Sequence, residues 1–334
     1  MKIIAEYIWT DSNNEFRSKV KILNKPNKIN INTFPQWNYD GSSTGQSQVN
    51  NSEIILDPYS FYEYNENYYL VFCENYKDDI YFTYRLTANK KFNKYLDIEP
   101  MFGLEQEFYV IDNINNLPVG FYKKDGYLSD TLMIENENKN YCGVGTINYK
   151  LRQFMDKVMI KLLELDISVT GMNMEVVPGQ CEFQICNTGI KACDELMVLR
   201  FLLCKIGEEF NYRINFKNKP YRDFSGSGCH INFSTKQMRN ENGIEYINKM
   251  LDKLKQSNPL EHRNYYGKNN YLRLTGKNET SKYCEFTFGI GCRSSSIRIP
   301  NEVIKYNCGY LEDRRPGANI DPYKACLYLF QFSL

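Results

Sequence analysis

The sequence predicts an α+β protein with two domains, a small one made mostly of strands and a larger mixed one. Alternation of polar and apolar residues over 2–9 and 16–24, around a polar turn, is typical of paired strands. Apolar residues spaced three and four apart over 151–165 are typical of an amphipathic helix. Because strands follow strands through short turns, antiparallel pairing fits best. We expect the first domain over 1–80 and the second over 81–334.

The first domain begins with these two strands, and a polar segment rich in Gly, Ser, Asn and Gln follows over 35–51. Runs of β-prone residues then predict two more strands, at 52–56 and 68–73. A helical pattern over 83–95 opens the second domain.

After this helix the second domain continues with a strand over 103–111 and a polar, irregular insertion over 112–140. Further on, the turn pair Pro178-Gly179 joins two β-rich runs into a hairpin. The helical and strand periodicities predict the other elements of this domain as helices over 151–165, 190–210 and 244–254 and strands over 212–216 and 230–233. The C-terminal part is expected to consist of strands and loops rich in Arg and Gly.

Composition and charge limit the classes of function. Forty-one basic and 40 acidic residues among 334 give a net charge of +1, which favours neither nucleic acid nor an anionic membrane as partner. The longest apolar run is too short to span a bilayer, and an early acidic residue argues against a signal peptide. The eleven cysteines include no C-x-x-C, which favours reduced thiols in a cytoplasmic protein. Rossmann and P-loop glycine motifs are missing, so those nucleotide sites are disfavoured.

The hairpin contains the strongest chemical signal in the chain. Symmetric pairing about Pro178-Gly179 sets Glu175 directly opposite Glu182. Two opposed carboxylates destabilise a sheet, and more so when they are half buried, unless a cation or a shared proton compensates them. The sequence therefore predicts that this hairpin binds a metal ion.

Two other strands carry polar side chains on one face. Glu105 and Glu107 lie two residues apart and therefore share a face, although an exposed strand face would show the same pattern. His230, Asn232 and Ser234 share a face of a strand that follows Gly-Ser-Gly, which lets a ligand approach the backbone. A single histidine is often structural, but a complete face of small hydrogen-bonding side chains favours a binding role.

Three arginine clusters follow, at Arg273, at Arg293 and Arg298, and at Arg314 and Arg315. Each alone would suit a surface salt bridge, whereas together they favour an anionic substrate. The carboxylates would select Mg²⁺ or Mn²⁺ over zinc or copper. Cations held by carboxylates, with arginines opposite, are what phosphoryl transfer requires, because the charge on the transferring oxygens must be neutralised.

These residues also carry a family resemblance that runs in order over nearly the whole chain. The chain resembles the eukaryotic-type glutamine synthetases in Trp37-Asn-Tyr-Asp40-Gly-Ser-Ser-Thr-Gly-Gln46, Gly103-Leu-Glu-Gln-Glu107, Tyr141-Cys-Gly-Val-Gly145, the hairpin, Gly-Cys-His230-Ile-Asn-Phe-Ser-Thr-Lys236, Arg293-Ser-Ser-Ser-Ile-Arg-Ile-Pro300 and Glu312-Asp-Arg-Arg-Pro-Gly-Ala-Asn-Ile-Asp-Pro322. The resemblance implies a small β-grasp domain, then a catalytic domain on a curved antiparallel sheet with flanking helices. It implies ATP-dependent ligation of ammonium to glutamate through γ-glutamyl phosphate, in a homo-oligomeric ring, pentameric or decameric, with active sites between subunits.

The same resemblance implies a role for each site residue. One metal ion would be bound by Glu107, Glu175 and Glu182, and another by Glu105, His230 and Glu312. The glutamate site would be formed by Arg273, Arg314 and the backbone of Gly226, beside Asp223 and Phe224. ATP and its transferring phosphoryl group would be bound by Asn232, Ser234, Arg293, Arg298 and Tyr310. Asp40 of the adjacent subunit would deprotonate ammonium, Arg293 would act in catalysis, and Glu279 would close over the site as a flap.

Several positions depart from the family's pattern. Ser225 stands where the family has an asparagine that grips glutamate, and Asn278 replaces a flap histidine. Lys150 takes the register of a residue near the ammonium pocket. These departures leave two alternatives open, a ligase of the same fold that acts on another amine or acid, and an inactive homologue with a structural or regulatory role.

Overall fold

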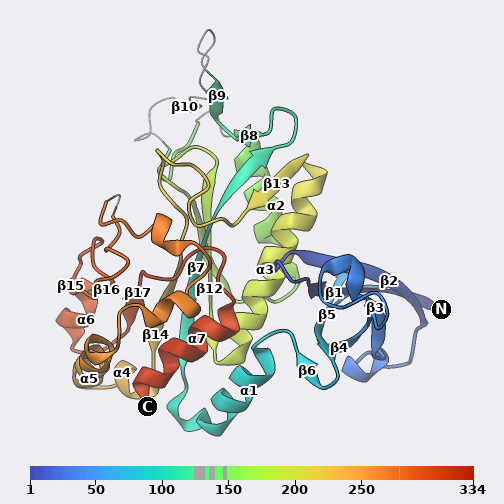
Figure 1. The fold of residues 1–334 in the computed structure, drawn as a ribbon, viewed down its shortest axis with the longest axis horizontal. Coiled ribbons are helices and arrows are strands. Elements are labelled where there is room, and N and C mark those ends of the chain that lie inside the picture. The colour runs from blue at the N-terminus through green and yellow to red at the C-terminus, as the bar shows by residue number, and fades with distance from the viewer. Residues whose placement is uncertain (124–131, 135–139, 146–148, 278) are drawn as a thin grey trace. The chain divides into compact units, whose positions relative to one another are not determined.

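The structure is a computed structural model, and it describes residues 1–123, 132–134, 140–145, 149–277 and 279–334. The chain folds into two compact units, Met1–Thr87 and Ala88–Leu334 (Figure 1). The first unit is built mainly of strands, and the second combines a large sheet with helices. The predicted α+β fold class is therefore confirmed.

The first unit contains a mixed sheet in the order β2-β1-β5-β4-β3, with β6 paired to β5. Strand β1 is antiparallel to β2 and parallel to β5. Alternate residues of β1, including Tyr7 and Trp9, pack with Phe34, Ile54 and Val71 in the core, because residues two apart share a face of the sheet. The elements are β1 (Lys2–Thr10), β2 (Phe16–Asn24), β3 (Trp37–Asp40), β4 (Glu53–Asn65), β5 (Tyr68–Lys77) and β6 (Ile80–Tyr81).

The second unit contains a larger sheet in the order β11-β12-β7-β14-β17-β16-β15, with β13 and β8 also paired to β7. Among the described pairs of this sheet only β15 and β16 are parallel, and the others are antiparallel, as expected. The strands are β7 (Met101–Asp112), β8 (Leu117–Pro118), β11 (Val169–Met174), β12 (Gln180–Thr188), β13 (Tyr212–Asn215), β14 (Cys229–Ser234), β15 (Phe288–Ile290), β16 (Ile297–Ile299) and β17 (Leu311–Asp313).

Helices cover the large sheet, and α3 is the central one. It contacts β7, β12 and β13 as well as α2 and α7, and most of its side chains are buried. Helix α2 is amphipathic, as its spacing predicts, with Leu151, Phe154, Val158 and Leu162 buried. The helices are α1 (Arg85–Lys94), α2 (Tyr149–Glu164), α3 (Ile190–Glu209), α4 (Lys236–Arg239), α5 (Ile244–Gln256), α6 (Asn301–Tyr306) and α7 (Pro322–Phe330).

The segment after β7 differs from the irregular insertion that the sequence predicts. Strand β8 pairs with β7, and β9 (Phe121–Lys123) pairs with β10 (Leu132–Ile134) in a small separate sheet. Phe121 is buried with Tyr109 and Val177 in a local core. The rest of the predicted insertion, over 124–131 and 135–139, lies outside the described residues.

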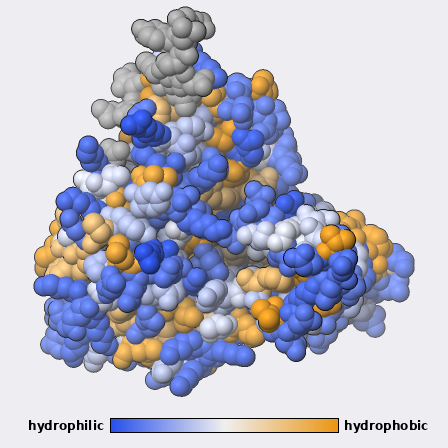
Figure 2. Space-filling model, in the orientation of Figure 1, coloured by the Kyte–Doolittle hydropathy of each residue, from blue (hydrophilic) through white to orange (hydrophobic). Residues whose placement is uncertain are grey.

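No described helix is long and apolar enough to cross a membrane. The face of the molecule shown in Figure 2 is mostly hydrophilic, with hydrophobic residues scattered among charged and polar ones.

Candidate active site

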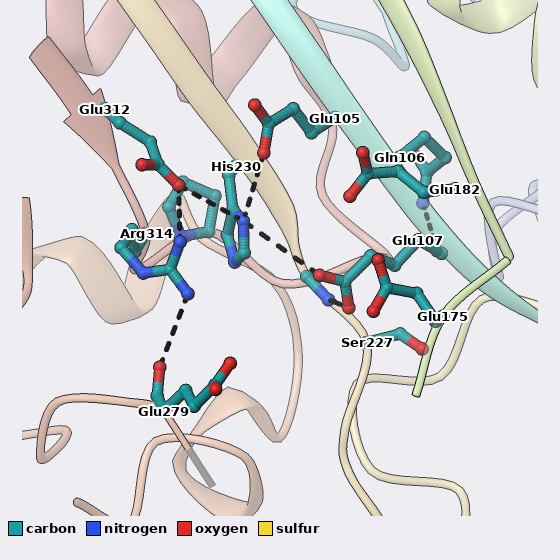
Figure 3. A network of polar contacts seen from close by, with 12 residues as sticks. Glu105, Gln106, Glu107, Glu175, Glu182, Ser227, His230, Glu279, Glu312 and Arg314 are labelled. Carbon is teal, nitrogen blue, oxygen red and sulfur yellow. Dashed lines mark hydrogen bonds and ion pairs between the residues drawn. The ribbon is translucent and has the colours of Figure 1, made fainter. Parts of the chain in front are cut away.

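Strand β7 presents two glutamates on one face of the large sheet. Glu105 and Glu107 alternate with Leu104, Gln106 and Phe108, which are buried on the opposite face. The side chains of the two glutamates are only 22% and 13% exposed, so the alternative of an exposed strand face does not apply. Figure 3 shows both carboxylates beside His230 and the other site residues.

The neighbouring strands add titratable side chains to the same face. Glu182 on β12 lies directly opposite Glu107, and His230 on β14 lies directly opposite Glu105. Glu312 follows on β17, which pairs with β14. Side chains opposite each other in antiparallel strands have Cβ atoms about 5 Å apart. The register of the sheet itself therefore brings these groups together.

Glu105, His230 and Glu312 are arranged as a candidate metal site. One ligand atom from each lies within 4.8 Å of the other two. Nδ1 of His230 is 3.5 Å from Oε2 of Glu105 and 3.6 Å from Oε1 of Glu312 (Figure 3). Two carboxylates and one imidazole suit a divalent cation. These are the three residues that the family resemblance assigns to one metal ion.

The hairpin register differs from the prediction, because Glu182 lies opposite Asn173 and not opposite Glu175. The N–H of Gln180 donates to the carbonyl of Val177 at 3.0 Å, and Gly179 has φ +74°, which is the pattern of a type II turn. Glu175 donates its N–H to the carbonyl of Gln180, so the loop of the hairpin spans residues 176–179 and the pairing is displaced by two residues from the predicted one. Because side chains alternate between the two faces of a sheet, a shift of the pairing by two residues leaves Glu175 on the same face as Glu182. Glu175 therefore still lines the cavity.

Burial and neighbouring carboxylates raise the pKa values of the hairpin acids. Burial, followed by the charges of Glu105 and Glu107, raises the pKa of Glu182 to about 9. Burial, followed by the charge of Glu175, raises the pKa of Glu107 to about 8, and burial raises the pKa of Glu175 as well. Protons therefore occupy part of this cluster at neutral pH, and a divalent cation would displace them.

The imidazole of His230 is neutral at neutral pH. Burial lowers its pKa well below the usual value, and the positive charge of Arg314 lowers it further, while Glu312 opposes the shift. Neutral imidazole is the form that binds metal ions. His230 therefore has the protonation state of a ligand.

Two arginines share the carboxylate of Glu312. Nη1 of Arg314 lies 2.5 Å from Oε1, and Nη1 of Arg298 lies 2.8 Å from Oε2. Arg314 also donates to the carbonyl of Glu279 (Figure 3) and to the carbonyl of Arg293, which ties two loops to the sheet. Arg293 and Glu279, both expected to act in catalysis, form an ion pair of 2.7 Å.

A small, partly open cavity lies beside the carboxylates. Arg273 is buried in its wall and donates through Nη2 to the carbonyls of Arg314, Arg315 and Pro316. Acids and arginines thus face the same space. The lining residues are Glu107, Glu175, Val176, Gln180, Ser225, Gly226, His230, Arg273, Glu279, Thr280, Arg293 and Arg314.

Four residues expected to contact the nucleotide are not among the described lining residues: Asn232, Ser234, Arg298 and Tyr310. Asn232 donates through Nδ2 to Oε1 of Glu105 at 2.7 Å and so contacts a candidate ligand. Ser234 is buried and accepts a hydrogen bond from an arginine of α4. Burial, followed by the charges of Glu105 and Glu312, raises the pKa of the Tyr310 phenol.

Other predicted residues lie elsewhere. Asp40 is in the first unit, where its Oδ1 accepts from the hydroxyl and N–H of Ser42, and these hydrogen bonds lower its pKa. Asp223 is exposed, and Phe224 packs edge to face on an aromatic ring of β9, so neither lines the cavity. Outside the described residues lie Asn278 and the side chain of Lys150.

One glutamine of the site was not predicted from the sequence. Gln180 lines the cavity and donates through Nε2 to the carbonyl of Gly226 and to Oγ of Ser227, each at 3.0 Å. Strand periodicity could have found it, because Gln180 lies two residues before Glu182 and therefore shares its face.

A family comparison supports the motifs seen in the sequence. The profile of the family described as glutamine synthetase, catalytic domain, matches residues 85–330. The chain is 41% identical over 339 residues to a putative glutamine synthetase of Acanthamoeba polyphaga mimivirus, covering 98% of this chain and 93% of that relative. It is 39% identical to the glutamine synthetase of Saccharomyces cerevisiae, covering 96% of this chain and 86% of that relative.

Two further comparisons concern a plant relative and a solved structure. The chain is 39% identical to a cytosolic glutamine synthetase isozyme of Pinus sylvestris, covering 96% of this chain and 91% of that relative. A cryo-electron microscopy structure of glutamine synthetase from Plasmodium falciparum matches with a TM-score of 0.73 and 16% identity, covering 99% of this chain and 71% of that chain. At this identity the structural likeness supports the fold alone.

Proposed function

The chain belongs to the eukaryotic-type glutamine synthetase family, and from this premise we propose that it makes glutamine with ATP through a γ-glutamyl phosphate intermediate. It is an enzyme, a ligase that joins ammonia to glutamate. In the proposed reaction the γ-carboxylate of glutamate attacks the γ-phosphate of ATP and releases ADP. Ammonia then displaces phosphate from the acyl phosphate and gives L-glutamine.

The main observation supporting this proposal is the convergence of five glutamates and one histidine beside a cavity lined by arginines. The buried acids with raised pKa values and the neutral imidazole fit divalent cations, and their oxygen atoms favour Mg²⁺ or Mn²⁺. When bound, such ions would neutralise the phosphate oxygens. We assign one ion to Glu105, His230 and Glu312 and another to Glu107, Glu175 and Glu182.

The arginines are suited to the anionic groups of the substrates. Arg273 and Arg314 would bind glutamate together with the backbone of Gly226, while Arg293 and Arg298 would bind phosphate. A Cβ atom on Gly226 would lie 2.4 Å from a backbone oxygen and 2.6 Å from Cγ of Arg273. Only glycine therefore allows this close approach of the backbone to an arginine of the wall.

A base is needed because ammonium is not a nucleophile. Asp40, with its lowered pKa, is ionised at neutral pH and would accept the proton. We infer that it serves the site of a neighbouring subunit in a homo-oligomeric ring of five or ten copies. Glu279, now paired with Arg293, would close over the site and keep water from the acyl phosphate.

A phosphate-release assay with ATP, glutamate, ammonium and Mg²⁺ tests this function. We expect release to need all four components, and omission of any one to abolish it. Ser225, which lines the cavity where the family has asparagine, motivates a parallel series with other amines and acids. Release only with one of those would support a ligase of altered substrate, and no release at any metal concentration would support an inactive homologue.

A further inference from the structure

Two lining residues of the cavity, Ser225 and Gly226, belong to a backbone segment, 224–228, in which every carbonyl group accepts a hydrogen bond from another part of the chain. The last two accept from backbone N–H groups of Ala318 and Glu107, each at 3.0 Å. The first three accept from side chains, in the order Lys219, Tyr109 and Gln180. The segment therefore has a fixed set of peptide orientations.

Tyr109 and Gln180 act from adjacent strands directly beneath this segment. They are opposite each other in the pairing of β7 and β12. The hydroxyl of Tyr109 donates to the carbonyl of Ser225 at 2.7 Å, and Nε2 of Gln180 donates to the carbonyl of Gly226 at 3.0 Å. Tyr109 is fully buried and Gln180 is 3% exposed, so both donors have little freedom to move.

The direction of one peptide group follows from these bonds. In a trans peptide the carbonyl and the following N–H point in opposite directions. The carbonyl of Ser225 points to buried Tyr109, so the N–H of Gly226 points away from it, and both residues line the cavity. Among the described residues no acceptor takes this N–H. It is a donor that points away from Tyr109, on a residue that lines the cavity together with Arg273 and Glu107.

We propose that Tyr109 and Gln180 are positioning residues for the acid substrate, because they orient the Gly226 N–H toward a substrate carboxylate bound by Arg273 and Arg314. The inference rests on the proposed function and names two residues beyond the expected glutamate site. Tyr109 itself contacts no substrate. Loss of its hydroxyl would free the peptide to rotate, which weakens binding of the acid but leaves the metal ligands and the phosphate-binding arginines unchanged.

The variant Tyr109→Phe tests the inference, since it removes one hydroxyl and keeps the packed ring. We expect the KM for glutamate to rise roughly threefold to tenfold, the effect of one hydrogen bond, with kcat, the KM for ATP and the Mg²⁺ dependence unchanged. The matched control is Tyr323→Phe, which removes another buried hydroxyl, bonded to Asp194 at 2.9 Å, away from the cavity lining. This control should lose similar stability and keep the KM for glutamate.

An unchanged KM for glutamate in Tyr109→Phe would overturn the inference. Equal rises in the KM values for glutamate and ATP would do so too, as would the same selective rise in the Tyr323→Phe control. Should Tyr109→Phe fail to fold, Gln180→Leu carries the test at saturating Mg²⁺, because Nε2 of Gln180 also donates to Oε2 of Glu107 at 3.4 Å. A rise in the KM for glutamate without a rise in the KM for ATP is expected there too. A wild-type protein without glutamate-dependent turnover would instead refute the proposed function, so the two failures are distinguishable.

Discussion

Replacing Glu182 with glutamine should stabilise the metal-free protein and destabilise the metal-bound protein. The side chain is 6% exposed, and burial, followed by the charges of Glu105 and Glu107, raises its pKa to about 9. In the unfolded chain the same group ionises near its ordinary value. Glutamine preserves the size and can still pair with Gln184, whose Nε2 lies 2.7 Å from Oε1, so the variant removes the charge and little else.

The magnitude follows from the shift in pKa. Each unit corresponds to about 1.4 kcal/mol. From the ordinary pKa of a glutamate up to roughly pH 7.5, the unfolded chain ionises this group and the metal-free folded chain does not. The raised pKa of Glu182 therefore lowers the free energy of unfolding of the metal-free protein by about 4 kcal/mol at most. Because neighbouring acids share this cost, we expect Glu182→Gln to recover about 1–2 kcal/mol, which raises Tm by about 2–5 °C. With Mg²⁺ the variant lacks one ligand, and metal affinity should fall at least about tenfold.

Thermal unfolding with EDTA and with Mg²⁺ plus ATP measures both effects. The control Glu241→Gln changes an exposed glutamate and should leave both Tm values unchanged. The reasoning is refuted if Glu182→Gln keeps the full rise in Tm that metal and ATP give the wild type. A Tm in EDTA below that of the wild type would also contradict it, because the buried charge would then not be costly.

Two further predictions concern pH and assembly. The raised pKa values of Glu107 and Glu182 stabilise the metal-free fold fully below about pH 4.5, and this contribution is lost as pH rises through about 8 to 9. Tm in EDTA should therefore fall from pH 5 to 9, and this fall should disappear with saturating Mg²⁺. An equal fall with Mg²⁺ would contradict the assignment of Glu107 and Glu182 as metal ligands. If Asp40 serves a neighbouring subunit, the Asp40→Asn and Glu182→Gln proteins are each inactive but should regain activity when they are dissociated and reassembled together. About a quarter of the interfaces in such mixed rings combine an intact Asp40 with an intact Glu182. Mixed rings without recovered activity would contradict a shared site.

The face of β7 could be predicted from the sequence because strand periodicity is local. Glu105 and Glu107 share a face for the same reason that Leu104, Gln106 and Phe108 share the other. His230 was predicted in the same way from its own strand. That these strands are neighbours in one sheet does not follow from periodicity, and only the family resemblance supplied the grouping.

The parts that could not be predicted depend on long-range packing. The two-residue offset of the hairpin arises because Glu175 pairs with Gln180, so that the loop spans 176–179, and the turn at Pro178-Gly179 lies at one end of this loop and not at its centre. Assuming symmetric pairing about the turn could not reveal this offset. The prediction that Glu175 faces the site was nevertheless right, because an offset of two residues leaves a side chain on the same face of the sheet. The contact of Tyr109 with the Ser225 carbonyl joins residues more than a hundred positions apart. No local pattern marks such a bond.

The central claim is that the glutamates of the site, together with His230, bind two divalent cations beside the arginines that line the cavity. Anomalous scattering from Mn²⁺ in crystals of the full chain tests this claim most directly. The account predicts two peaks, one at bonding distance from Glu105, His230 and Glu312 and one at bonding distance from Glu107, Glu175 and Glu182. A map in which Mn²⁺ peaks occur elsewhere and these six side chains bind none would contradict it.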